Sequence, residues 1–332
     1  MSKILVTGGA GMIGSNLLKR LTKLGHDVMV IDNLWRGKLD YLNDFSSGKP
    51  VIDLNKNFFN IDLSQEIKDI TPFKDVEYII HLADVVAGID YVFNNQSNLF
   101  RQNVLINSNT IELAKQIKVK GYIYAGTACS FPLELQNSFD YKLLKEENLY
   151  PANPESAYGW SKLMGIYETE LMEKDFGIPT LTLMFHNVYG SPCDYSVARS
   201  QVIPSLIRKA INYPKEDFLV WGSGKQGRAF IHINDIVDAL VLGLEKGLGN
   251  GYIQIGPDVS TTIAEIAKSI VKISGKDINI VFDTTKPEGD KARAADFSKA
   301  TRVLGWKPRI SLEEGLKETY QWIEARIKEE MK

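Results

Sequence analysis

The chain lacks several features on which other classes of protein depend. Its 332 residues include only two cysteines, Cys129 and Cys193, which are too few for a disulfide framework and predict a reducing compartment. No run of about 18 apolar residues occurs, and Met1 to Lys3 lead straight into a predicted strand, so we expect neither a membrane span nor a signal peptide. A net charge of -2 without a long basic run argues against a nucleic acid partner. These absences predict a soluble, cytoplasmic protein.

A glycine-rich turn near the start of the chain has the sequence of a pyrophosphate-binding site. Residues 7–14 read Thr-Gly-Gly-Ala-Gly-Met-Ile-Gly, between a predicted strand at 3–7 and a predicted helix at 13–24. Glycines there allow a tight turn and close approach of a phosphate, and the free N–H groups of the helix N-terminus favour an anion. Without a ligand the same pattern would be a tight strand–helix turn. The residues predicted to contact the dinucleotide are Gly8, Gly11, Met12, Ile13 and Gly14.

An acidic residue follows the second predicted strand, as an NAD site requires. Residues 27–31 read as a strand that ends at Asp32, whose carboxylate can accept both ribose hydroxyls of NAD and would repel the 2′-phosphate of NADP. Arg36, just beyond it, leaves NADP open. The other residues predicted to flank the adenine and the ribose follow strand ends: Asn33, Asp62, Leu63, Leu82 and Ala83.

Strand and helix signals alternate along the first half of the chain. Strands are predicted at 58–61, 76–80 and 121–125, and a long helix at 98–119. This alternation predicts an α/β fold, a doubly wound parallel sheet with helices on both faces. In such a sheet, ligands bind at the carboxyl ends of the strands, near the point where the strand order reverses.

Tyr158 and Lys162 are the predicted proton-transfer pair. They lie four residues apart on one face of a helix predicted at 156–174, separated by roughly 6 Å of rise. A nearby ammonium and a cofactor ribose favour the phenolate, so we expect the pKa of Tyr158 to be lowered toward the working pH. Tyr158 can then take a proton from a substrate hydroxyl that Thr127, at the end of its strand, also contacts. A tyrosine on a helix is more often part of the core, but its position after the Thr127 strand favours the catalytic reading.

The helix at 156–174 is apolar around nearly its whole circumference. This pattern predicts burial on more than one side, which an intersubunit contact would supply. A central helix in one large core is the alternative.

The order of these motifs resembles that of the extended short-chain dehydrogenase/reductases, in the branch that acts on nucleotide-diphosphate sugars. The resemblance runs from the glycine turn through Asp32-Asn33-Leu34 and the Tyr158–Lys162 pair to Leu304-Gly305-Trp306-Lys307-Pro308. It implies a Rossmann-type NAD-binding domain at 1–180. It also implies a smaller part at 181–332 that mainly binds the nucleotide sugar, with some segments returning to the sheet. A homodimer through the helices at 98–119 and 156–174 is implied as well, and no metal is expected.

Within that branch the chain resembles the GDP-mannose 3,5-epimerases. The stretch Ala125-Gly126-Thr127-Ala128-Cys129-Ser130-Phe131-Pro132 resembles their motif, whose cysteine is an acid/base at sugar carbons C3 and C5. The resemblance therefore implies this role for Cys129, although a buried thiol is otherwise a small apolar side chain. The residues implied to contact the substrate are Gly88, Asn187, Arg228 and Arg293, where either arginine alone could instead be surface charge.

One departure from that family keeps other reactions open. The family pairs its cysteine with a lysine on the opposite face of the sugar, and the matching position here, counted without gaps from Tyr189-Gly190, is Ser196. Epimerisation at C4 alone, or oxidoreduction at C4, therefore remains an alternative. Ala128-Cys129 in place of an Asp-Glu pair counts against 4,6-dehydration. A noncatalytic NAD-binding sensor is the alternative of a different class, and the intact set of Thr127, Tyr158 and Lys162 argues against it.

Overall fold

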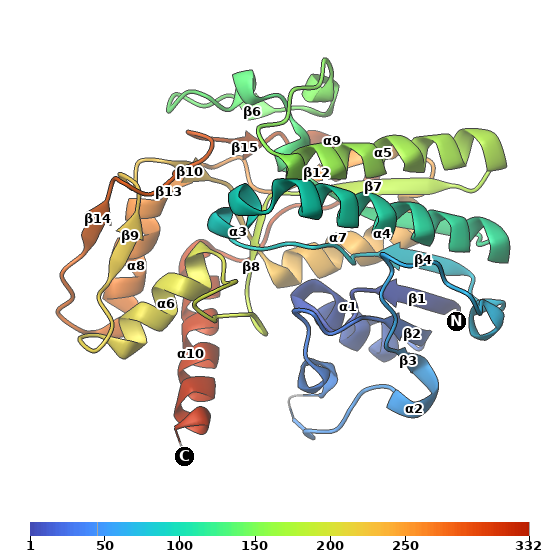
Figure 1. Cartoon of the computed structure of the whole chain (residues 1–332), viewed down its shortest axis with the longest axis horizontal. Coiled ribbons are helices and arrows are strands. Elements are labelled where there is room, and N and C mark those ends of the chain that lie inside the picture. Colours follow the sequence, from blue (N-terminus) through green and yellow to red (C-terminus); the bar gives the residue numbers. More distant parts are fainter. Residues whose placement is uncertain (45, 332) are drawn as a thin grey trace.

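The computed structural model describes residues 1–44 and 46–331, and its centre is a sheet of seven strands (Figure 1). From one edge to the other the strands are β12 (Gly251–Ile255), β7 (Thr180–Phe185), β5 (Gly121–Thr127), β4 (Tyr78–His81), β1 (Lys3–Thr7), β2 (Asp27–Ile31) and β3 (Phe58–Phe59). Every adjacent pair runs parallel. The order reverses between β1 and β4, where a doubly wound sheet opens a crevice for ligands. The predicted fold class is confirmed.

Helices cover both faces of this sheet. The first face carries α1 (Met12–Lys23), α7 (Ile233–Lys246) and α9 (Ser298–Leu304), and the second carries α4 (Gln96–Ile117) and α5 (Ala157–Phe176). Because side chains alternate along a strand, Ile4 and Val6 of β1 pack into the first layer and Leu5 packs into the second. β5 and β7 are buried along their whole length, which explains why their sequences carry no charged residue.

A smaller lobe of helices and short strands stands beside the sheet (Figure 1). Its apolar core is formed by α6 (Val202–Asn212), α8 (Ile263–Ser274) and α10 (Leu312–Glu330), together with β9 (Leu219–Trp221), which pairs with β14 (Val281–Asp283). β7 and β12, which come from the second half of the chain, belong to the central sheet. The division at residue 180 stays a prediction.

Short elements complete the fold. They are α2 (Leu54–Asn57), α3 (Ile89–Asn94) and the strand pairs β6 (Leu143–Leu144) with β15 (Ala294–Ala295), β8 (Asn187–Tyr189) with β11 (Phe230–His232), and β10 (Gly227–Arg228) with β13 (Thr261–Thr262). The β6–β15 pair matters most for the site, because it holds the segment that carries Arg293 against the loop that follows β5.

Each strand and helix predicted in the first half of the chain has an observed counterpart, with ends that differ by at most two residues. The strand predicted at 58–61 is reduced to β3, and the one predicted at 121–125 extends to Thr127. No helix of the described residues is long and apolar enough to cross a membrane.

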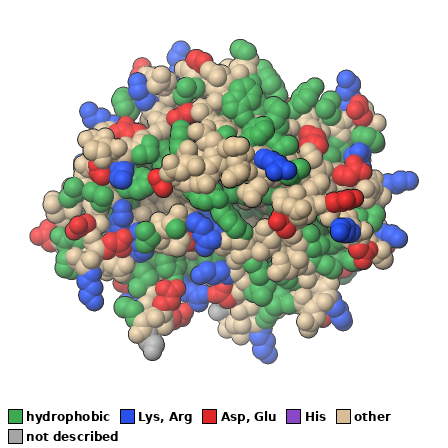
Figure 2. Space-filling model, viewed as in Figure 1, with side chains coloured by type: hydrophobic (Ala, Val, Ile, Leu, Met, Phe, Trp, Pro, Cys, Tyr) green, Lys and Arg blue, Asp and Glu red, His purple; other side chains and the backbone are tan. Residues whose placement is uncertain are grey.

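One face of α5 is apolar and exposed in the single chain. Trp160, Met164 and Tyr167 keep 37%, 37% and 51% of their surface accessible. Figure 2 shows hydrophobic side chains gathered on the upper part of the molecule, where α5 crosses the view of Figure 1. Part of the apolar circumference predicted to be buried is therefore uncovered here.

Candidate active site

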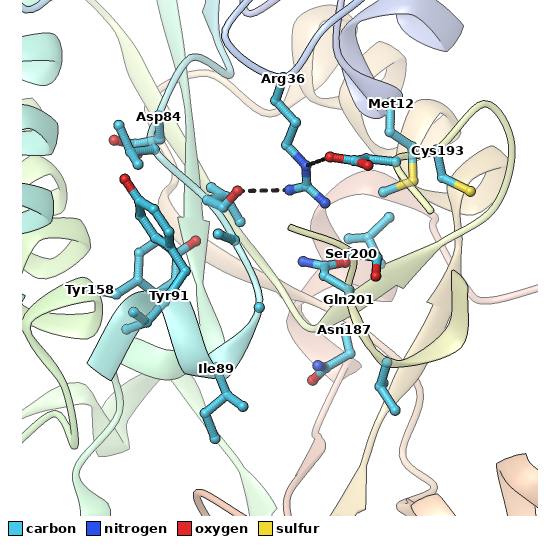
Figure 3. Close-up of a pocket in the computed structure, with 18 of the residues that line it drawn as sticks. Met12, Arg36, Asp84, Ile89, Tyr91, Tyr158, Asn187, Cys193, Ser200 and Gln201 are labelled. Carbon is cyan, nitrogen blue, oxygen red and sulfur yellow. Dashed lines mark hydrogen bonds and ion pairs between the residues drawn. The ribbon is translucent and has the colours of Figure 1, made fainter. Parts of the chain in front are cut away.

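A cavity of about 1020 Å³ opens along the carboxyl ends of the strands and reaches the smaller lobe (Figure 3). In that view Asp84 and Tyr158 lie on one wall, with Arg36, Cys193 and Asn187 across the opening. All the residues predicted from the sequence to bind or react line the cavity: Gly8, Gly11, Met12, Ile13, Gly14, Asp32, Asn33, Asp62, Leu63, Leu82, Ala83, Gly88, Thr127, Cys129, Tyr158, Lys162, Asn187, Arg228 and Arg293. The structure brings them together, and their individual roles stay predictions.

The glycine turn has a shape that side chains would destroy. Gly8 has a φ of +66° and donates its N–H to the carbonyl of Ile31 at 2.8 Å. A Cβ on Gly14 would lie 2.3 Å from the Gly8 carbonyl oxygen, and one on Gly8 would lie 2.9 Å from the backbone of Ala83. Gly11 caps α1 without a side-chain hydrogen bond, so the first N–H groups of a 12-residue helix face the cavity. Such a cradle fits the pyrophosphate of a dinucleotide.

Asp32 lies at the end of β2, beside this turn. Its carboxylate accepts hydrogen bonds from the N–H groups of Ala10 at 2.9 Å and Leu34 at 2.8 Å. Burial raises the pKa of Asp32, and the two backbone hydrogen bonds oppose that rise. Arg36 is turned away from this acid: it donates to the Val86 carbonyl at 2.8 Å and lies 3.7 Å from the carboxylate of Asp194 (Figure 3). Arg36, the residue that kept binding of NADP as an alternative, is therefore engaged with other partners.

Tyr158 and Lys162 project from the first turns of α5, whose N-cap Ser156 accepts a hydrogen bond from the Gly159 N–H at 3.3 Å. The Lys162 ammonium donates to the Ala125 carbonyl at 2.7 Å and forms an ion pair with Asp84. Burial raises the pKa of Tyr158 well above its ordinary value, the charges of Cys129 and Asp84 add to that rise, and a hydrogen bond with Thr127 opposes it.

The expectation that the pKa of Tyr158 would be lowered is thus wrong for this structure. The sequence argument counted the ammonium of Lys162 as an uncompensated positive charge beside the phenol. In the structure Asp84 offsets that charge, and burial of the phenol dominates.

Cys129 follows β5 and lies against an arginine. Its backbone N–H donates to the Thr127 hydroxyl at 3.2 Å, and Arg293 donates to its sulfur at 3.3 Å and to the side-chain oxygen of Asn187 at 3.4 Å. Arg293 also pairs with Asp290 at 2.7 Å. The side chain of Arg293 is buried, so the surface-charge alternative does not hold for it.

Arg228 is the second arginine of this wall. It is also buried, and it donates to the carbonyls of Gly227 at 2.8 Å and Asp290 at 2.7 Å. Burial, followed by the charge of the neighbouring Arg293, lowers its pKa to about 10. It therefore remains a cation at neutral pH.

Asp84 and Glu155 are among the lining carboxylates that the sequence analysis did not select. Burial, followed by the charge of Asp290, raises the pKa of Glu155 to about 7, while Arg228 and Arg293 oppose the rise. Glu155 precedes the Tyr158 motif in a loop, and from the sequence alone it would be taken for a charge exposed to solvent. Its position could be suspected from the neighbouring motif, but its partners lie far along the chain.

Ser196, the position matching the family lysine, is not among the residues that line the cavity. Its backbone N–H donates to Asp194 at 2.9 Å. Among the described residues, the lysines that line the cavity are Lys162, paired with Asp84, and Lys209, which donates to the Leu219 carbonyl. No group of three or more metal-ligating side chains occurs in the described parts of the chain.

A parallel sheet that presents bare helix N–H groups and an acidic residue at its switch point is the fold of dinucleotide-dependent enzymes. Residues 4–256 match the model of the NAD dependent epimerase/dehydratase family. The chain belongs to this family, and its cofactor is NAD.

Similarity to known proteins extends over nearly the whole chain. It is 31% identical over 328 residues to GDP-mannose 3,5-epimerase of Arabidopsis thaliana, covering 99% of this chain and 84% of that protein. It is 30% identical over 336 residues to GDP-L-fucose synthase of Escherichia coli K12, covering 96% of each. The structure of UDP-glucose 4-epimerase from Thermotoga maritima with UDP-glucose matches with a TM-score of 0.83 at 28% identity, covering 98% of this chain and 99% of that one. That of UDP-glucuronic acid 4-epimerase from Bacillus cereus with UDP-glucuronic acid and NAD gives 0.82 at 26% identity, with the same coverage.

Proposed function

We propose that the chain converts a nucleotide-diphosphate sugar through transient oxidation at sugar carbon C4, with epimerisation at C3, C5 or both as the net reaction. The observation that carries this proposal is the meeting of Thr127, Cys129 and Tyr158 in one cavity, with Arg293 on the cysteine sulfur. The substrate class, a nucleotide-diphosphate sugar, is supported by the names of relatives, which refer to GDP-linked and UDP-linked sugars. Their names include both 3,5- and 4-epimerases.

The first proton transfer belongs to Tyr158 and Thr127. NAD, when bound, would supply the acceptor, and later the donor, of the hydride at sugar carbon C4. In its phenolate form, Tyr158 accepts the proton of the hydroxyl on that carbon, and the Thr127 hydroxyl, which shares a hydrogen bond with the phenol, orients the same group. The buried Lys162–Asp84 pair lies beside the phenol and fixes one side of this site.

Cys129 is proposed to act on the oxidised sugar. A ketone at C4 makes the hydrogens on C3 and C5 acidic, so a thiolate within reach can remove one of them and return a proton. The thiolate is the reactive form of a cysteine, and Arg293 donates a hydrogen bond to this sulfur at 3.3 Å.

Binding of the diphosphate is assigned to the same wall. Arg228 and Arg293 are buried cations there, and guanidinium groups donate well to phosphate oxygens. Asn187 lies beside Arg293. Gly88 lies so close to Ser200 that a Cβ would stand 2.9 Å from the Ser200 carbonyl oxygen, so the two backbone segments meet closely at this side of the cavity.

Epimerisation at C4, or oxidoreduction at C4, is the second candidate. Ser196 lies outside the cavity lining, so the position that supplies a lysine in the 3,5-epimerases offers no proton donor here. These C4 reactions need the tyrosine and threonine but no second acid. The 4,6-dehydratase reading is less favoured, since Ala128 and Cys129 stand where it requires an acidic pair.

A panel of GDP-, UDP-, CDP- and dTDP-sugars tests the proposal. In the presence of NAD, thermal shift identifies the base, since a ligand at about 100 times its dissociation constant stabilises by roughly 2.7 kcal/mol. Product analysis by NMR then identifies the carbon. Tyr158→Phe should retain NAD and nucleotide binding and lose about 10² to 10⁴ in rate. Normal turnover by that variant contradicts the mechanism, and NAD binding without change in any sugar supports the sensor alternative.

A further inference from the structure

Asp84 follows β4 and is the closest charged partner of Lys162. Its side chain is 0% exposed, that of Lys162 is 5% exposed, and the two form an ion pair. Among the described residues, neither carboxylate oxygen of Asp84 has a conventional hydrogen-bond partner, so the ammonium is its sole compensation. Asp84 also lines the cavity, on the same wall as Tyr158 (Figure 3).

The ammonium of Lys162 is enclosed on its other sides. It donates to the Ala125 carbonyl at 2.7 Å and lies 4.8 Å from the centre of the Tyr124 ring. A buried ammonium held by a carbonyl, a ring and a carboxylate has little freedom to change direction. Removing either member of such a pair leaves an uncompensated buried charge on the other.

We propose that Asp84 is a positioning residue that anchors Lys162 and offsets its charge, so that an ion pair, rather than a free ammonium, stands beside Tyr158. The inference goes beyond the proposed sugar chemistry. It rests on that chemistry only in the pH dependence of turnover, and not in the comparison of melting temperatures.

The groups around the pair show what this arrangement does. Those that face it are His81 of β4, Tyr122 and Tyr124 of β5, and Tyr158 of α5, with Cys129 and Arg293 on the far side of Tyr158. Burial is the main cause that raises the pKa of each of the three tyrosines, and Asp84 adds to the rise in each. Asp84 therefore raises the pH at which Tyr158 loses its proton and can act as a base.

The first test is the pH dependence of turnover in the NAD-loaded enzyme. Asp84→Asn removes the negative charge of the carboxylate and leaves the positive charge of Lys162 without its ion-pair partner. Both changes favour the phenolate form of Tyr158. The acid limb of the kcat profile, which rises as Tyr158 loses its proton, should therefore move to lower pH by about one unit. Asp90→Asn is the matched control, because Asp90 lines the same cavity and its carboxylate accepts a hydrogen bond from Asn94. An unmoved acid limb in a folded Asp84→Asn enzyme overturns the proposal.

The second test needs no turnover. Melting temperatures are compared for Asp84→Asn, Lys162→Met and the double variant, each with NAD absent. An anchoring pair predicts that the double variant loses clearly less than the sum of the two single losses, since no unpaired buried charge remains. Additive losses overturn the proposal. If the wild-type chain changed no nucleotide sugar, the proposed function would fail, while this comparison would still decide the role of Asp84.

Discussion

The guanidinium of Arg293 donates a hydrogen bond to the sulfur of Cys129 at 3.3 Å, across 164 residues of sequence. Both side chains line the cavity. The other cysteine, Cys193, is 3% exposed, and burial raises its pKa to about 12. Cys193 is thus a buried thiol, whereas Cys129 is half-buried and accepts a hydrogen bond from Arg293, a placement that suits proton transfer.

Weakening this contact should slow chemical modification of Cys129. Arg293→Met removes the cation, and we expect alkylation by iodoacetamide to slow by about tenfold, the effect of losing an interaction of about 1.4 kcal/mol. The rate is measured by mass spectrometry of the peptide that contains Cys129. Arg293→Lys, which keeps the charge and the pairing with Asp290, should lose less. Equal rates in all three proteins would show that Arg293 does not activate the thiol.

Glu155 should make substrate binding depend on pH. Because burial raises its pKa to about 7, this carboxyl is largely protonated in mildly acidic solution and gains a negative charge above neutrality. That charge lies near Arg228 and Arg293 and competes with a diphosphate for them. We expect the KM for the nucleotide sugar to rise several-fold from roughly pH 6 to roughly pH 8. In Glu155→Gln the KM should be nearly constant over this range, and a rise like that of the wild type would contradict the assignment.

NAD should bind more tightly than NADP. The carboxylate of Asp32 would repel a 2′-phosphate, and Arg36 is engaged with Val86 and Asp194. Isothermal titration should give a dissociation constant for NADP at least about tenfold higher, a difference of about 1.4 kcal/mol. Asp32→Ala should narrow the difference. Tighter binding of NADP by the wild type would overturn this part of the site.

The chain should form a homodimer through α4 and α5. The exposed apolar side chains of α5, Trp160, Met164 and Tyr167, form a face that a second copy can bury. Light scattering at micromolar concentration should give twice the chain mass of 37.3 kDa. Tyr167→Glu places a charge in that face and should shift the mass toward the monomer. A monomeric wild type is the contrary result.

The local motifs of the site could be predicted from the sequence because each depends on short-range spacing. The glycines of the turn, Asp32 after its strand, and the Tyr158–Lys162 spacing on one helix need only a few residues to be recognised. A parallel sheet then collects the strand ends at one edge, which is why Thr127 and Ala83 meet the cofactor residues in one cavity.

The parts that were missed depend on contacts between distant segments. Asp84 follows a predicted strand end, but its pairing with Lys162 requires β4 and α5 to be placed in space. The charge around Glu155 comes from Asp290, Arg228 and Arg293 of the smaller lobe. The predicted direction of the shift in the Tyr158 pKa was wrong for the same reason, since the sequence shows the lysine but not the carboxylate that offsets its charge.

The central claim is that Cys129 exchanges a proton next to a transient C4 ketone, and turnover in deuterium oxide tests it most directly. The wild-type enzyme, with NAD and the nucleotide sugar that it converts, is compared with Cys129→Ala, and the position of deuterium is read by NMR. We predict solvent deuterium at C3 or C5 of the sugar with the wild type and none with Cys129→Ala. Turnover without deuterium at either carbon, together with an active Cys129→Ala enzyme, would contradict the claim and leave chemistry at C4 alone.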